Sequence, residues 1–152
     1  MSGENSAFDL LHKNIQQWIY KNGWEELRPA QVESIKEIRQ TSNHLIICSP
    51  TASGKTEAAM LPLISELLEK NIYEKSYIIY ISPLKALIND QFTRLESLCK
   101  DNDICVVPWH GDISSSIKKK IDKNNQAILL ITPESLEACL LYTSDAADDK
   151  QC

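Results

Sequence analysis

The chain lacks several features that mark particular classes of protein. No apolar run approaches the roughly 20 residues that a membrane-spanning helix needs, and the N-terminus has no signal-peptide pattern. The five cysteines form no C-x-x-C pair and have no metal-ligand spacing with histidine. These absences exclude a membrane protein and a disulfide-stapled domain, and they predict free thiols in a cytoplasmic protein.

An excess of positive charge is also lacking. The 16 basic and 21 acidic residues give a net charge of −5, so any nucleic-acid binding must depend on the local placement of donors. Hydrophobic residues make up 43% of the 152 residues and charged residues 24%, which is typical of a folded globular domain.

Glycine is scarce, with four in the whole chain, yet one of them lies in the most informative segment, residues 49–56. This segment, S-P-T-A-S-G-K-T, follows an apolar run at 44–48 and precedes a helical pattern, as a phosphate-binding loop requires. Lys55 would contact the outer phosphates and the Thr56 hydroxyl would coordinate Mg²⁺. Ser49 and Ala52 stand where such loops often have glycine, and an ordinary strand-to-helix turn is the alternative.

The hydrophobic periodicity alternates between strands and helices. We expect a disordered stretch at 1–8 and helices near 9–21, 29–40, 55–70, 84–100, 113–122 and from 133 onward. Strands are expected near 44–48, 76–81, 104–108 and 126–131. This order predicts an α/β fold, a mostly parallel sheet with helices on both faces, in which ligands bind at the carboxyl ends of the strands.

Three segments that follow these strands resemble helix caps. Ser82 and Pro83 fit an N-cap and a first helical position, and Thr132 and Pro133 form the same pattern. Asp112 can cap a third helix. Helix N-termini aligned along one sheet edge would suit a sugar–phosphate backbone, to which Lys85 adds a charged contact. Each segment taken alone is better explained by ordinary helix capping.

Five segments in a fixed order carry a family resemblance: 23–31, 50–58, 80–87, 109–112 and 132–136. Together they resemble the first RecA-like domain of the superfamily 2 DEAD/DEAH-box helicases, especially the large helicase-related (Lhr) type. The resemblance covers roughly residues 8–138 and implies a P-loop NTPase domain that uses ATP and Mg²⁺.

The resemblance assigns the nucleotide site. Gln31 would read the adenine edge, Arg28 would support that pocket, and Phe8 is a candidate for stacking on the base. Lys55 and Thr56 would be catalytic, with Thr56 also binding Mg²⁺ through ATP. The residues implied to bind ATP are Arg28, Gln31, Thr51, Ala52, Ser53, Gly54, Lys55 and Thr56.

The resemblance also assigns contacts to one strand of nucleic acid, DNA being favoured because the Lhr type implies it. The implied residues are Pro83, Lys85, Ala86, Arg94, His110, Gly111, Thr132, Pro133 and Glu134. An ion pair with Asp90 explains Arg94 equally well. The lysine run at 118–120 is interpreted as a solvated helix face.

Two parts of the expected machinery are missing. No D-E-x-[DH] segment follows Leu136 to hold Mg²⁺ and orient water, and no second RecA-like domain is present in cis. Residues 9–138 are thus expected to form an incomplete ATP-binding domain that is inactive alone. Residues 139–152 break the helical pattern and resemble a translated sequencing adapter, a prediction that resequencing intact genomic DNA would test.

The sequence therefore predicts the N-terminal part of an ATP-dependent nucleic-acid helicase or translocase. A regulatory P-loop module that binds nucleotide without helicase activity is the alternative. A small-molecule kinase that shares only the phosphate loop would explain neither the segment around Gln31 nor the repeated proline-capped loops.

Overall fold

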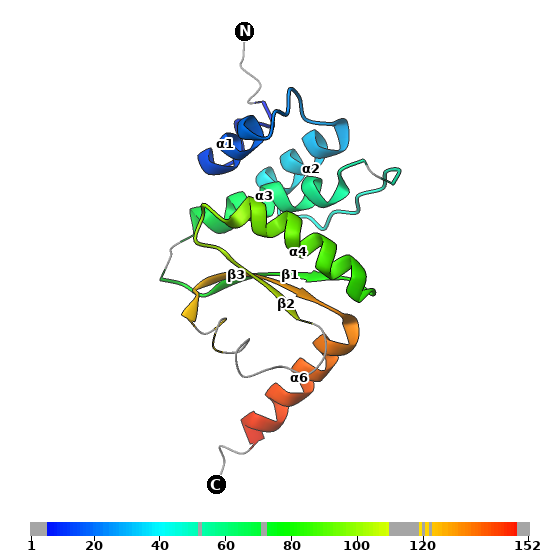
Figure 1. The fold of residues 1–152 in the computed structure, drawn as a ribbon, viewed down its shortest axis with the longest axis vertical. Helices are drawn as coiled ribbons and strands as arrows, with labels where there is room; N and C mark the ends of the chain where they lie inside the picture. The colour runs from blue at the N-terminus through cyan, green and yellow to red at the C-terminus, as the bar shows by residue number, and fades with distance from the viewer. Residues whose placement is uncertain are drawn as a thin grey trace. The chain divides into compact units, whose positions relative to one another are not determined.

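The computed structural model describes residues 6–51, 53–70, 73–109, 119, 121 and 123–148. The chain divides into two compact units, residues 1–71 and 72–152, and each is described by itself. Figure 1 traces the order of the elements along the chain. Among the described residues, no helix has both the length and the apolar character needed to cross a membrane.

The first unit contains three helices, α1 (Lys13–Lys21), α2 (Pro29–Gln40) and α3 (Lys55–Glu69). Helix α1 begins four residues later than predicted because the His12 side chain caps it, accepting a hydrogen bond from the Asn14 N–H at 3.2 Å. Helices α2 and α3 have the predicted starts, and both α1 and α2 pack against α3. The core of the first unit is built around the fully buried Ile15, Ile35, Leu61 and Ile64.

The predicted strand at 44–48 is wrong. This segment has no regular secondary structure, and within it Leu45 and Ile46 are both exposed, Ile46 to 86%. A strand needs a neighbouring strand to pair its backbone donors and acceptors, and no described residue of the first unit forms one. A short apolar run cannot reveal whether such a partner is available.

The second unit contains a parallel sheet of three strands in the order β1-β3-β2. The strands are β1 (Ser76–Ile81), β2 (Cys105–Trp109) and β3 (Gln126–Ile131), as predicted to within one residue. The central strand β3 is buried on both faces, which explains its nearly continuous apolar sequence. Its last residue, Ile131, pairs with the last residues of both neighbours, Ile81 and Trp109.

This unit also contains the helices α4 (Lys85–Cys99) and α6 (Pro133–Asp148). Helix α4 packs on β2 and β3, and α6 extends from the end of β3 on the side of the sheet away from α4 (Figure 1). The predicted break after Ala138 is wrong, because α6 continues to Asp148 through good helix formers such as Leu140 and Ala146. The adapter origin of 139–152 stays a prediction, and the helix expected at 113–122 lies largely outside the described residues.

Candidate functional site

The loop 49–56 ends in a conformation that only glycine adopts readily. Gly54 is the N-cap of α3 and has a φ of +82°, in the left-handed region. Because α3 begins at the next residue, its first backbone N–H groups and the positive end of its dipole lie at the loop. This arrangement of a tight turn opening a long helix suits the binding of an anion such as a phosphate.

The Lys55 side chain is held by backbone carbonyl groups of the same loop. Its ammonium donates hydrogen bonds to the carbonyl oxygens of Ser49 at 2.7 Å and Pro50 at 2.6 Å. An ammonium has three donors, so one remains for an incoming phosphate oxygen. The predicted phosphate-contacting lysine is therefore positioned by two fixed acceptors rather than free in solvent.

Gln31 contacts this loop from helix α2. Its Oε1 accepts a hydrogen bond from the Arg28 backbone N–H at 2.9 Å, which caps the start of α2. Its Nε2 lies only 2.6 Å from the place where a Cβ on Gly54 would stand. The structure thus brings together Arg28, Gln31 and Gly54 from two segments that are far apart in the sequence.

The burial of Gln31 differs from the sequence expectation. The apolar Val32 and Ile38 of α2 are only half-buried, whereas the polar Gln31 is 2% exposed. The apolar pattern missed Gln31 because a polar side chain is expected at the surface unless its hydrogen bonds are satisfied internally. In this conformation the amide has a structural role, as a helix cap and as a contact to the loop.

The remaining loop residues differ in exposure. Thr51 is exposed, Thr56 is half-buried in the first turn of α3, and Ala52 lies outside the described residues. In the described part of the chain no group of three or more His, Cys, Asp or Glu side chains could hold a metal. The Thr56 hydroxyl is an oxygen donor of the type that Mg²⁺ prefers, so a magnesium ion here would depend on phosphate oxygens for its other ligands.

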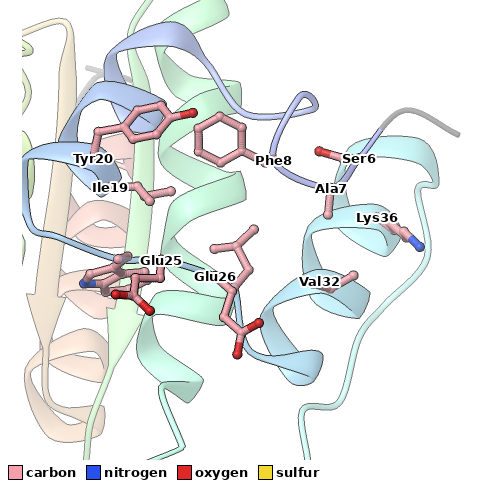
Figure 2. A pocket seen from close by; sticks show the side chains of 11 residues that line it. Ser6, Ala7, Phe8, Ile19, Tyr20, Glu25, Glu26, Val32 and Lys36 are labelled. Carbon is pink, nitrogen blue, oxygen red and sulfur yellow. The ribbon is translucent and has the colours of Figure 1, made fainter. Parts of the chain in front are cut away.

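A pocket of about 470 Å³ lies elsewhere in the first unit (Figure 2). Phe8 and Tyr20 lie at its rim and pack edge to face, with ring centroids 5.3 Å apart. Its other walls come from Ser6 and Ala7, from α1 and α2, and from the residues between these helices, including Trp24 and Leu27. The described residues that line it include neither Gln31 nor the loop 49–56, so stacking of Phe8 on adenine stays a prediction.

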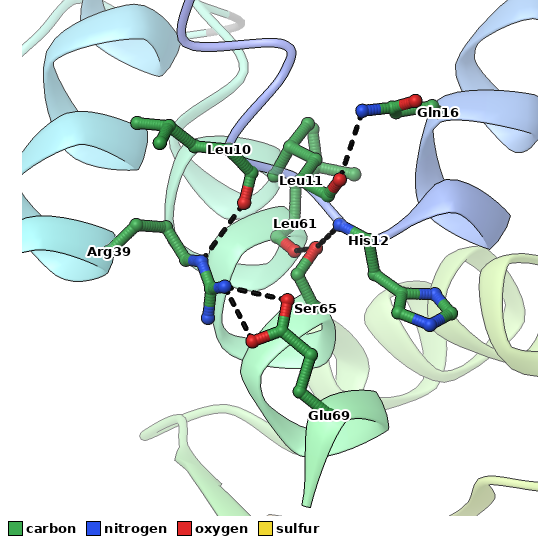
Figure 3. Close-up of polar contacts among 8 residues, drawn as sticks. All are labelled: Leu10, Leu11, His12, Gln16, Arg39, Leu61, Ser65 and Glu69. Carbon is green, nitrogen blue, oxygen red and sulfur yellow. Dashed lines mark hydrogen bonds and ion pairs between the residues drawn. The ribbon is translucent and has the colours of Figure 1, made fainter. Parts of the chain in front are cut away.

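The segment that carries Phe8 is fastened to the helices by its backbone (Figure 3). The Arg39 Nε donates to the Leu10 carbonyl at 3.0 Å, and its guanidinium pairs with Glu69 at 2.6 Å. The Ser65 hydroxyl accepts from the His12 N–H at 3.1 Å and donates to the Leu61 carbonyl at 2.9 Å. Neither Arg39 nor Ser65 could be identified from the sequence, because each bonds to groups far away along the chain, the Leu10 carbonyl and Glu69 for Arg39 and the His12 N–H for Ser65.

The second unit gathers the segments predicted to contact nucleic acid at one edge of its sheet. The ends of β1, β2 and β3 are in register, and the Ser82 N–H donates to the Ile131 carbonyl at 3.0 Å. The exposed side chains of Pro83, Lys85 and Ala86 follow β1, and those of Pro133 and Glu134 follow β3. The predicted adjacency of these two segments is therefore present in the fold.

The capping predictions for these segments have different outcomes. Thr132 caps α6 as predicted, since its hydroxyl accepts from the Ser135 N–H at 3.3 Å and its carbonyl from the Leu136 N–H at 2.9 Å. The prediction for Ser82 and Pro83 is wrong, because α4 begins at Lys85 with Leu84 as its N-cap. Ser82 is instead buried and extends the pairing with β3.

Of three further predicted residues, the structure describes one. Arg94 is exposed on α4, and His110 and Gly111 lie outside the described residues. Trp109, just before them, is 7% exposed, and its indole N–H has no hydrogen-bond partner in the described part of the chain. The contribution of this third loop to the edge stays a prediction.

Comparison with known proteins identifies the family. The sequence profile of the DEAD/DEAH box helicases matches residues 28–151, which include both the loop 49–56 and the edge segments. The chain belongs to the DEAD/DEAH box helicase family.

Curated relatives agree with this family. The ATP-dependent helicase Lhr-Core of Methanocaldococcus jannaschii is 35% identical over 153 aligned residues, which cover 90% of this chain and 18% of that protein. The ATP-dependent DNA helicase Hel308 of Methanococcus vannielii is 31% identical over 140 residues, again covering 90% and 18%. The chain therefore spans less than a fifth of the length of these relatives.

Solved structures of helicases have the same fold. The helicase MrfA superposes with a TM-score of 0.73 at 26% identity, covering 86% of this chain and 20% of that one. The RNA helicase Prp28 of Chaetomium thermophilum, bound to ADP, gives 0.71 at 25% identity, covering 87% and 33%. The predicted α/β class with a parallel, RecA-like sheet is confirmed.

Proposed function

We propose that this DEAD/DEAH-box chain is the ATP-binding part of a larger nucleic-acid helicase or translocase. The observation that carries the proposal is the loop 49–56, where Gly54 opens α3 and Lys55 is held with one ammonium donor available. The triphosphate would bind there, with its outer phosphates at Lys55, and the Thr56 hydroxyl would help to hold a Mg²⁺ ion that neutralises phosphate charge. Thr51, Ala52 and Ser53 would supply the remaining contacts of the loop.

The base of the nucleotide would lie toward Arg28 and Gln31. The contact between Gln31 and Gly54 supports this arrangement, because a base held by Gln31 would then lie next to phosphates held by the loop. Reading adenine requires the Gln31 amide to turn from the Arg28 N–H toward the base, where it can both donate and accept. This requirement would link base recognition to the start of α2.

The carboxyl edge of the sheet would bind the backbone of one strand of nucleic acid. Lys85 supplies a positive charge there, and the first N–H groups of α4 and α6 are donors for phosphate oxygens. We propose DNA over RNA, supported by the name of the Hel308 relative, a DNA helicase. Arg94, His110 and Gly111 are proposed to extend the same contact surface.

We infer that this chain binds ATP without hydrolysing it at a useful rate. Phosphoryl transfer in this class needs an acidic pair to hold Mg²⁺ and orient water, and no D-E-x-[DH] segment follows Leu136. It also needs the arginine fingers of a second RecA-like domain. In the larger protein, closure of the two domains around ATP would change the grip on the strand.

Titration of ATP and Mg²⁺ into the 152-residue chain by calorimetry tests this proposal. We expect saturable binding that Lys55→Ala abolishes, because the substitution removes the charge at the outer phosphates. Lys70→Ala, at the opposite end of α3, is the matched control and should bind like the unmodified chain. Equal binding by the Lys55→Ala and unmodified chains would refute a phosphate site at this loop.

A further inference from the structure

Ser49 stands where the phosphate-loop motif has glycine, and its hydroxyl makes a hydrogen bond within the loop. The Ser49 Oγ and the Ser53 Oγ are hydrogen-bonded to each other across the loop. Ser49 is the first residue of the loop and Ser53 the fifth, so this bond joins the residue where the loop begins to the residue just before Gly54. Either hydroxyl can be the donor.

A second set of bonds ties the same two ends together. The Ser49 and Pro50 carbonyls both accept from the Lys55 ammonium, at 2.7 and 2.6 Å. The beginning of the loop is therefore connected to its end through the Ser49 side chain and through Lys55. Both sets of bonds favour one arrangement of the loop, in which the Lys55 side chain reaches back to Ser49 and Pro50.

We propose that Ser49 is a positioning residue, whose hydroxyl braces the loop 49–56 in the form that receives phosphate and so raises the affinity for nucleotide. This inference rests on the proposed function, since it concerns the same loop. Fixing a loop in its bound form before the ligand arrives improves affinity because less conformational entropy is lost on binding. Serine also restricts the backbone more than the glycine of the motif, so side chain and backbone act in the same direction.

A double-mutant cycle tests the brace. The affinity of a fluorescent ATP analogue with Mg²⁺ is measured for the 152-residue chain, Ser49→Ala, Ser53→Ala and the double variant. We expect Ser49→Ala to weaken binding by about three- to tenfold, the effect of one neutral hydrogen bond. The double variant should bind hardly more weakly than Ser53→Ala alone, because either substitution already breaks the bond. Ser42→Ala, an exposed serine just after α2, should leave the affinity unchanged.

Hydrogen exchange of the loop amides without nucleotide supplies a second readout. A braced loop exchanges more slowly, so Ser49→Ala should speed exchange at residues 50–54 while Ser42→Ala does not. Unchanged exchange, additive losses of affinity, or a Ser49→Ala chain that binds as tightly as the unmodified chain or more tightly would overturn the brace. The proposed function fails separately, if Lys55→Ala leaves the affinity of the analogue intact.

Discussion

Among single residues, Gly54 carries the greatest constraint in the candidate site. Its φ of +82° is costly for any residue with a Cβ, and that Cβ would meet the Gln31 Nε2 at 2.6 Å. Gly23, which follows the C-cap of α1, also has a positive φ, +68°, but a Cβ there would meet nothing within 4 Å. A substitution at Gly23 would therefore introduce backbone strain alone, whereas one at Gly54 would introduce both backbone strain and a steric clash.

This difference gives a prediction for two alanine substitutions. Gly23→Ala should lower the free energy of unfolding by about 1 kcal/mol, through backbone strain alone. Gly54→Ala should lower it by about 2–3 kcal/mol, because the displaced Gln31 side chain adds a packing penalty. Urea titrations monitored by circular dichroism measure both values.

A third variant identifies the source of the extra cost. In the Gly54→Ala background, Gln31→Ala removes the opposing amide, so the double variant should be less destabilised than the sum of the two single variants. Strict additivity would contradict the contact between Gln31 and Gly54.

The cysteines also differ sharply from one another. Burial, together with the nearby Cys105 thiol, raises the pKa of Cys99 from 9.0 to about 12, whereas Cys48 is exposed. At pH 8 a thiol-specific reagent such as Ellman's reagent should modify Cys48 rapidly and Cys99 only as fast as the chain unfolds. Rapid labelling of Cys99, identified by mass spectrometry, would contradict its burial.

The same pKa shift has a consequence for stability. Because the Cys99 thiol ionises near pH 9 when unfolded but near pH 12 when folded, its contribution to stability is fully present below pH 9. It should be lost progressively as the pH rises from 9 to 12. A Cys99→Ala chain should lack this part of the alkaline decline.

At the scale of elements, local signals located most of the structure. Pro29 marks the start of α2, Gly54 the start of α3, and dense apolar runs mark β1 and β3. The predictions that failed depend on contacts between segments that are far apart in the sequence. The segment 44–48 is apolar but has no strand beside it, and Ser82, read as a helix cap, continues the pairing of β1 with β3.

The site was predictable to a similar degree. The phosphate loop and the edge segments follow from short motifs with fixed spacing, so Lys55, Lys85 and Thr132 could be named from the sequence. The burial of Gln31 and the bond between Ser49 and Ser53 could not, because they depend on how α2 and the loop meet in space.

The joint between α2 and α3 supplies a prediction about elements. Arg39→Ala should lower the free energy of unfolding by about 1–2 kcal/mol, because it removes both the bond to the Leu10 carbonyl and the pair with the partly exposed Glu69. Arg39→Lys should lower the free energy of unfolding by less than Arg39→Ala does, because it keeps a positive charge near Glu69. Lys36→Ala, an exposed residue of the same helix, should change stability by less than about 0.5 kcal/mol. Equal midpoints for Arg39→Ala and Lys36→Ala in urea would show that this joint adds nothing.

At the scale of the whole molecule, the two proposed sites belong to two compact units. The first unit carries the proposed phosphate loop and its contact with Gln31, and the second carries the sheet edge with Lys85 and Thr132, proposed to bind nucleic acid. In a helicase, binding at one site must influence the other. The central claim is therefore that nucleotide and nucleic acid are coupled in the protein to which this chain belongs.

ATP hydrolysis by the full-length protein, measured with and without single-stranded DNA, tests this claim most directly. We predict that the strand stimulates hydrolysis, that Lys55→Ala abolishes it, and that Lys85→Ala weakens mainly the stimulation. The same measurement with single-stranded RNA tests the preference for DNA. Nucleotide binding and hydrolysis that are indifferent to either strand would contradict the account and favour a regulatory nucleotide-binding module.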